Sequence, residues 1–120
     1  MDIRLKRAYE TAARSDGPRV LVDRIWPRGV AKADADIAHW LKGLAPSTEL
    51  RKWFGHDPDK WAEFQKRYLK ELNSDDASDD VQALKQLLEE KERITLVYAA
   101  KDTEHNNAVA LRDFVLKDRL

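Results

Sequence analysis

Two short apolar runs constrain the fold of this 120-residue chain more than any other feature of its sequence. Residues 20–22 form the unbroken triplet VLV, and residues 94–99 form the run ITLVYA. Such runs are typical of strands that are covered on both faces, because a strand with one wet face alternates between apolar and polar residues. Helical periodicity between the two runs favours a parallel pair with a right-handed crossover. We therefore expect an α/β sheet.

The sequence around these runs gives the expected extent of the sheet. The first buried strand is expected over residues 19–26, because Pro27 lacks an N–H donor and Gly29 permits a sharp turn. Residues 3–7 alternate apolar and charged side chains, which predicts a half-buried edge strand whose direction stays open. The prediction is a small, mainly parallel sheet of about three strands with helices on both faces. This is a three-layer, incomplete doubly wound or rhodanese-like fold, in a single domain over residues 1–120.

Helical periodicity accounts for much of the remaining chain. In residues 36–44 the apolar side chains fall at i, i+3, i+4 and i+7, which predicts an amphipathic helix. Its apolar stripe is Ile37, Trp40, Leu41 and Leu44, and Asp34 or Asp36 is the expected cap. Further helices are expected from Pro46-Ser47 to Gly55, from Asp57-Pro58 to Leu72, over residues 79–92 after a Ser78 cap, and after a cap at Asp102 or Thr103.

Composition excludes several functional classes. Lys and Arg number 22 and Asp and Glu also number 22, so a net charge of zero makes a general affinity for nucleic acid or an anionic membrane unexpected. The chain has no Cys, which removes thiol nucleophiles and thiolate metal sites. No apolar run approaches the roughly 20 residues that span a bilayer, and the start MDIRLKRAY lacks the apolar core of a signal peptide. The expected location is cytoplasmic.

The candidate site lies where the two buried strands end. In a parallel sheet, ligands collect beyond the carboxyl ends of the strands, where loops and helix N-termini meet. Residues 23–29 supply Asp23, Arg24 and Arg28, and residues 101–107 supply further polar groups at the start of the last helix. If the strands are neighbours, both loops face one cleft. Arginine, lysine and a helix N-terminus there would suit a phosphate, sulfate or carboxylate group.

The ligand-binding candidates are Asp23, Arg24, Arg28, Lys101, His105 and Asn106. Arg24 and Arg28 can bind an anion in a bidentate manner, while His105 or Asp23 donates or accepts a proton. The alternative for each is structural, since Asp23 and Arg24 can pair with other charges and Lys101-Asp102 can be a turn and a cap. The sequence names no catalytic residue, reaction or oligomeric state. His39, His56 and His105 show no metal spacing, and no cofactor is expected.

A second hypothesis is a non-enzymatic protein-interaction or regulatory module. It rests on the segment from Trp40 to Trp61, where an exposed aromatic side chain would be a natural anchor. Core packing is the structural alternative for the four Trp residues of the chain. Arg51-Lys52 and Lys66-Arg67 are expected on solvated helix faces rather than in a basic groove.

Three long strings resemble a known family. The strings RVLVDRIWPRGVAK, HWLKGLAPSTELRKWFGHDPDKW and LVYAAKDTEHNNAVALRDF are similar to the YeaO-like branch of the family called domain of unknown function 488. The resemblance runs from about residue 9 to about residue 114. It supports the α/β fold and implies no particular activity, because the family is uncharacterised. Residues 20–24 also look like the Asp-containing strand of rhodanese-type domains, which is a likeness of fold alone.

The resemblance also bears on the chemistry of the last loop. Other branches of that family look as if they carry a Cys-Ala-Glu-Lys string followed by His-Cys-His-Arg. Here Lys101 and His105 match that pattern, whereas Tyr98 and Asn106 stand at the two thiol positions. The resemblance therefore implies a site that is kept in outline without thiol chemistry, which favours anion binding over covalent catalysis.

Overall fold

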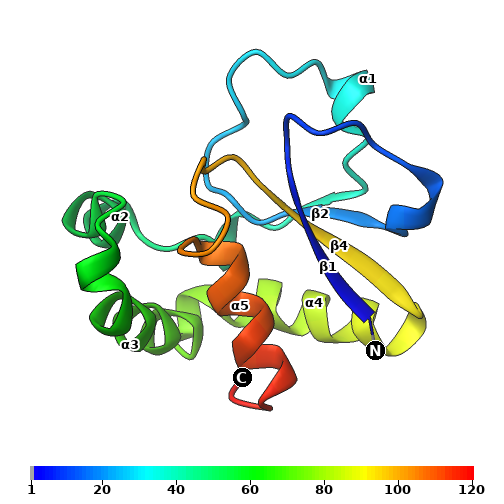
Figure 1. The fold of residues 1–120 in the computed structure, drawn as a ribbon. Helices are drawn as coiled ribbons and strands as arrows, with labels where there is room; N and C mark the ends of the chain where they lie inside the picture. The colour runs from blue at the N-terminus through cyan, green and yellow to red at the C-terminus, as the bar shows by residue number, and fades with distance from the viewer. Residues whose placement is uncertain (1) are drawn as a thin grey trace.

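The computed structural model describes residues 2–120 and has a sheet of four parallel strands in the order β1-β4-β2-β3 (Figure 1). The strands are β1 (Asp2–Arg7), β2 (Arg19–Leu21), β3 (His39–Trp40) and β4 (Arg93–Tyr98). The two apolar runs are neighbours, since Val20 pairs with Leu96 in β4. The parallel pair and the edge position of β1 are confirmed, and the open direction of β1 is settled as parallel to β4.

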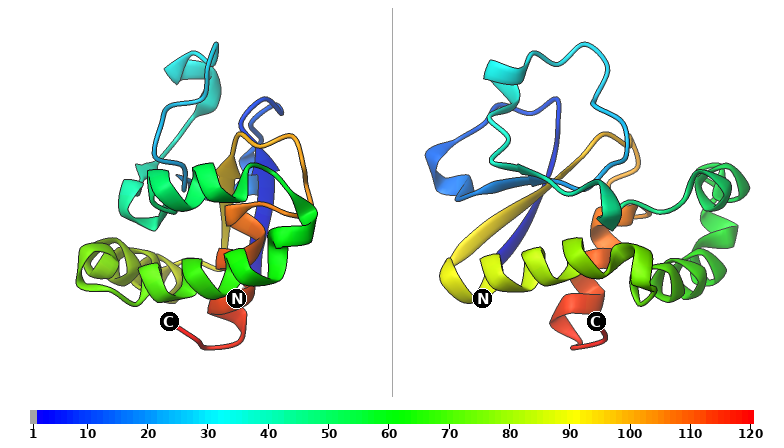
Figure 2. Two further views of the ribbon diagram at one scale, coloured as in Figure 1. Left: turned by 90° about the vertical axis from the view of Figure 1, so that its left-hand side faces the viewer. Right: turned by 180° about the vertical axis from the view of Figure 1, so that it is seen from behind.

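One face of the sheet carries most of the core. The buried strand residues on this face are Ile3, Val20, Ile94, Leu96 and Tyr98. The helices that pack against them are α3 (Trp61–Leu72), α4 (Ser78–Glu90) and α5 (Asn107–Leu116). Figure 2 shows α4 and α5 crossing one side of the sheet. Each fully buried aliphatic side chain of this kind contributes about 1.5–3 kcal/mol relative to an exposed one.

The opposite face is covered mainly by one connection. Leu21 and Val97 point to this side and pack with Trp26 and Ile37 from the segment between β2 and β3 and with Trp40 of β3. That segment carries the short helix α1 (Lys32–Ala35). The Trp26 and Trp40 rings meet edge to face, with centroids 5.4 Å apart. The helical cover is therefore thick on one face and limited to α1 and its flanking loops on the other.

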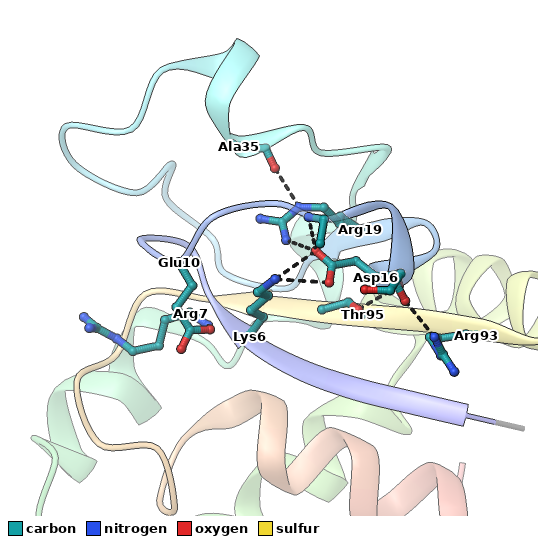
Figure 3. Close-up of polar contacts among 10 residues, drawn as sticks. Lys6, Arg7, Glu10, Asp16, Arg19, Ala35, Arg93 and Thr95 are labelled. Carbon is teal, nitrogen blue, oxygen red and sulfur yellow. Dashed lines mark hydrogen bonds and ion pairs between the residues drawn. The ribbon is translucent and has the colours of Figure 1, made fainter.

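A buried charge cluster also lies on this second face (Figure 3). Arg19 Nη1 lies 2.7 Å from Asp16 Oδ2, and Lys6 Nζ lies 3.2 Å from Asp16 Oδ1. Arg19 Nε donates to the carbonyl of Ala35, and Thr95 Oγ1 donates to the carbonyl of Asp16. Burial acts to raise the pKa of Asp16, but the Ala13 N–H and the two cations hold it below its usual value. The cluster ties α1 to three strands.

The helix expected over residues 36–44 does not form. Asp36 has a left-handed φ of 48° and ends α1, and β3 and the 3-10 helix η2 (Lys42–Leu44) follow it. The apolar stripe is divided between the two faces of the sheet. Ile37 and Trp40 pack on the second face, whereas Leu41 and Leu44 join the main core. Part of this stretch instead forms a strand at the sheet edge, so the sheet has four strands rather than about three.

Two expected boundaries also move. The strand expected over residues 19–26 ends at Leu21, because the Asp23 side chain accepts the N–H of Ala99 and so ends the backbone ladder. The last helix begins at Asn107, and its cap is Asn106, which accepts the N–H of Val109, rather than Asp102 or Thr103.

The middle of the chain follows the expectation closely. α2 (Thr48–Phe54) is capped by Ser47 and ends at Gly55, whose φ is +54°. Asp57 caps the 3-10 helix η3 (Pro58–Lys60), which continues into α3. A 3-10 turn, η4 (Asp75–Ala77), leads into α4, where Ser78 is the first helical residue rather than the cap. No helix within residues 2–120 is long and apolar enough to cross a membrane.

Candidate functional site

The loops that follow β2 and β4 open into a single cleft. Its volume is about 810 Å³, and both loops line it, through residues 23–28 of the first and residues 99–102 and 105–107 of the second. Figure 1 shows the loop after β4 beside the connection that leaves β2, with α2 to one side. Residues 45–46, the end of α2 with His56, and Phe64 of α3 complete the lining. We call this cavity the cleft.

Asp23 joins the two loops at the floor of the cleft. Its Oδ2 accepts the N–H of Ala99 at 2.9 Å, and its Oδ1 accepts an N–H of the Asn107 amide at 3.0 Å. The same Asn107 nitrogen donates to the carbonyl of Val22 at 3.0 Å. Asp23 therefore fixes the end of β2 to the end of β4 and to the start of α5.

The environment of Asp23 disfavours its charge. Burial raises the pKa of Asp23 above its usual value, although the hydrogen bonds from Asn107 and Ala99 and the nearby Arg51 oppose this effect. Because both carboxylate oxygens already accept hydrogen bonds from the protein, we assign Asp23 mainly to holding the loops together. This is the structural role that the sequence left open.

The loop between β4 and α5 holds an aspartate–histidine pair. Asp102 Oδ1 accepts the backbone N–H groups of Glu104 and His105, and Asp102 Oδ2 lies 3.0 Å from Nδ1 of His105. The two backbone hydrogen bonds keep the pKa of Asp102 below its usual value. The His105 ring also meets Trp61 edge to face, with centroids 5.4 Å apart. The Asp102 carboxylate favours the His105 tautomer with the proton on Nδ1. The second ring nitrogen, Nε2, is then the atom that can contact a ligand, because the ring lines the cleft.

Asn106 is a structural residue. Its Oδ1 caps α5, and its Nδ2 donates to the carbonyl of Asp102. Its side chain is buried against Tyr98, the other residue at a thiol position of the resemblance. Burial raises the pKa of the Tyr98 phenol, so this group stays neutral at ordinary pH. Tyr98 therefore packs in the core and Asn106 caps α5, at the two positions where the family resemblance implies thiols.

Positive charge gathers around the cleft. Five Lys and Arg side chains line it, with Asp23 and Asp102 as the acidic lining residues. These cations are Arg24, Arg28, Arg51, Lys52 and Lys101. Arg24 Nη2 makes a long 3.4 Å contact with the carbonyl of Ala45. Within residues 2–120 the other four side chains make no hydrogen bond or ion pair, in contrast to the paired cations of Figure 3.

The sequence missed one wall of the cleft. Arg51, Lys52 and His56 belong to α2 and the turn after it, and the sequence analysis assigned Arg51-Lys52 to a solvated helix face. Both side chains are exposed, so that assignment describes their solvation correctly. Their direction toward the cleft depends on how α2 packs on α3. No local pattern in the sequence contains that information.

The four Trp residues are all partly buried. The indole nitrogens of Trp26 and Trp40 donate to the carbonyls of Val30 and Asp23. Trp53 lies under the Arg67 guanidinium at 4.1 Å, and Trp61 stacks on Phe64. Each Trp therefore has a partner within the chain, and the interaction-module hypothesis stays a prediction without a defined anchor.

Comparisons with known proteins identify relatives of the chain. A family model described as "Inactive DUF488-N3 subclade" matches residues 2–120. The chain is 43% identical over 117 residues to the uncharacterized protein YeaO of Escherichia coli K12, covering 96% of this chain and 97% of that protein. It is 45% identical over 82 residues to the uncharacterized protein Rv3073c of Mycobacterium tuberculosis H37Rv, covering 68% of this chain and 70% of that protein.

No solved structure gives a significant match. The family model spans the whole described chain, and the likeness to YeaO covers nearly all of both proteins. The chain therefore belongs to the DUF488 family, as a YeaO-like member.

Proposed function

We propose that this protein binds a small molecule carrying a phosphate, sulfate or carboxylate group in the cleft, without thiol chemistry. The observation that supports it most is the set of five cationic side chains around one cavity in a chain whose net charge is zero. Four of the five have no partner within residues 2–120, so their charge is available to a ligand. A volume of about 810 Å³ is in the range of small-molecule sites.

The surrounding structure adds to this electrostatic argument. The ten-residue helix α5 begins at the cleft, and the N-terminus of a helix carries partial positive charge. Arg24 comes from the loop after β2 and Arg51 from α2, and both carry guanidinium groups, which hold an oxyanion through two parallel N–H donors. His105 lines the same space and adds an N–H donor when its second nitrogen is protonated. Binding of this kind requires no turnover.

A charge-matched pair of variants tests the proposal. Arg24→Gln/Arg51→Gln removes two cations from the cleft, whereas Lys66→Gln/Lys70→Gln removes two exposed cations from α3, outside the cleft. Thermal unfolding is followed with sodium phosphate and with sodium sulfate against sodium chloride at equal ionic strength. Ligand at 100 times its Kd stabilises the folded protein by about 2.7 kcal/mol. We expect the α3 control to keep this stabilisation and the cleft variant to lose most of it.

Two results would count against anion binding in the cleft. One is the absence of any stabilisation of the unmodified protein by either anion at tens of millimolar concentration. The other is an equal response in the cleft variant and the α3 control, which would show that the anions act on overall charge.

A further inference from the structure

We propose that the anion recognised by the cleft is carried on a flat apolar group, as in an aryl phosphate. This inference rests on the proposed anion site and adds the chemical class of the group attached to the anion. Three features of the cleft support it, namely an exposed isoleucine, an apolar lining and a volume larger than a small anion requires.

The first feature is Ile25, whose exposure has no structural explanation. It is 63% exposed and stands beside Arg24 in the cleft lining. The other large apolar side chains that are exposed within residues 2–120 are Tyr9 and Leu116, and neither lines the cleft. A single exposed apolar side chain is ordinary on a surface. Ile25 differs because it lies next to the cations that would hold the anion, where an apolar part of the same ligand would cover it.

The second feature is the apolar character of the walls. The apolar lining residues besides Ile25 include Trp26, Pro27, Ala45, Pro46, Phe54 and Phe64. Phe54 and Phe64 are 6% and 2% exposed and stack on each other with centroids 4.4 Å apart. The half-buried Trp26 is therefore the Phe or Trp side chain of the lining with the most surface left for a ligand. Aromatic surfaces of this kind favour a flat partner through stacked or edge contacts. A polar sugar phosphate would instead bring hydroxyl groups against surfaces that offer few hydrogen bonds.

The third feature is size. A cleft of about 810 Å³ is far larger than an inorganic phosphate or sulfate ion requires. The loop that carries Arg24 and Arg28 also carries Ile25 and Trp26, so cationic and apolar lining residues stand side by side along one stretch of backbone. A ligand whose anionic end meets the arginines therefore has its attached group against apolar surface. The cations and the apolar lining of the cleft together fit an anion that is attached to an aromatic group.

Calorimetric titration with three probes tests this inference. The probes are inorganic phosphate, methyl phosphate and phenyl phosphate, and each is titrated into the unmodified protein and into two variants. Ile25→Ser removes the exposed apolar side chain from the cleft, and Leu116→Ser removes one with 56% exposure at the end of α5. For the unmodified protein we expect phenyl phosphate to bind at least tenfold more tightly than methyl phosphate.

The variants then locate the apolar contact. We expect Ile25→Ser to weaken phenyl phosphate binding by about fivefold to tenfold, the effect of losing one largely covered aliphatic side chain, and to leave methyl phosphate unchanged. Leu116→Ser is expected to change neither affinity. Equal affinities for phenyl and methyl phosphate, or an undiminished phenyl preference in Ile25→Ser, would overturn this inference while the anion site stands. If no probe binds, the anion site itself is wrong.

Discussion

Asp23 shows how one side chain at a strand end organises two loops. It accepts hydrogen bonds from Ala99 and Asn107, and these bonds replace the backbone pairing that β2 would otherwise continue. The sequence named Asp23 as a candidate ligand or proton-handling group. The structure gives both of its oxygens protein partners, which a sequence without contacts has no means of showing. The residues that remain open to a ligand are the cations around it.

The raised pKa of Asp23 predicts a pH-dependent contribution to stability. Burial raises the pKa in the folded state, so the folded state binds the proton more tightly than the unfolded state. The stabilisation from this group is therefore complete below the unfolded pKa of about 3.9 and is lost as pH rises through the folded pKa. Asp23→Asn removes this dependence.

Urea unfolding of the protein and of Asp23→Asn between pH 3 and pH 6 measures the effect. We expect the variant to be less stable by about 1–3 kcal/mol at pH 3, because the amide NH2 cannot accept the hydrogen bond from Ala99 or Asn107, whereas the hydroxyl oxygen of the neutral carboxyl group still can. The difference is expected to narrow as pH rises. A difference that widens with pH would contradict the pKa direction.

The Arg19–Asp16 pair predicts a large loss on truncation. Both side chains are buried, and removal of Arg19 leaves the buried Asp16 carboxylate with the more exposed Lys6 as its cationic partner. We expect Arg19→Ala to lower the free energy of unfolding by about 3–5 kcal/mol. Lys6→Ala removes the more exposed cation from the same carboxylate and is expected to cost less. Chemical denaturation measures both, and equal losses would show that burial does not set the effect.

Among the elements, α2 connects stability to the cleft. Ser47 Oγ accepts the N–H of Leu50 and donates to Glu71, and the Ser47 N–H donates to the same carboxylate. The cap therefore fixes both the start of α2 and its position against α3. Because α2 carries Arg51 and Lys52, this local contact also places one cationic wall of the cleft.

A pair of serine variants tests the importance of this cap. Ser47→Ala is expected to reduce the free energy of unfolding by about 1–2 kcal/mol, the usual cost of a lost N-cap. Ser78→Ala, at the start of α4, removes a side chain that makes no capping hydrogen bond and is expected to change stability by less than about 0.5 kcal/mol. Guanidinium unfolding compares them, and a loss in Ser78→Ala as large as that in Ser47→Ala would contradict the assignment of the cap.

Some local sequence signals were sufficient to predict the boundaries of the elements, and others were not. Ser47, Gly55 and Asp57 predicted helix boundaries correctly, because caps and turns depend on residues close in sequence. The apolar stripe in residues 36–44 predicted a helix incorrectly, because its side chains pack on two faces of the sheet. A strand of two residues has no periodicity of its own, so β3 was visible only through its pairing with β2.

For the whole molecule, the distribution of charge matters more than its sum. The net charge of zero argued against general binding of polyanions. A net charge also gives no information about where the fold places the individual cations. Cations on the second face are paired in the Asp16 cluster, whereas those at the strand ends gather around the cleft. The position of the cleft followed from the parallel topology, which the two apolar runs predicted. The contribution of α2 did not, because it depends on packing between segments far apart in sequence.

The most direct test of anion binding in the cleft is a phosphate titration followed residue by residue in backbone amide NMR spectra. We predict saturable shifts in the cleft-lining residues, which fall within residues 23–28, 51–56 and 99–107. The residues that line a separate hollow, within residues 8–12 and 29–36, serve as the internal control and are expected to shift little. Shifts centred on that second hollow, or spread evenly without saturation, would contradict the account.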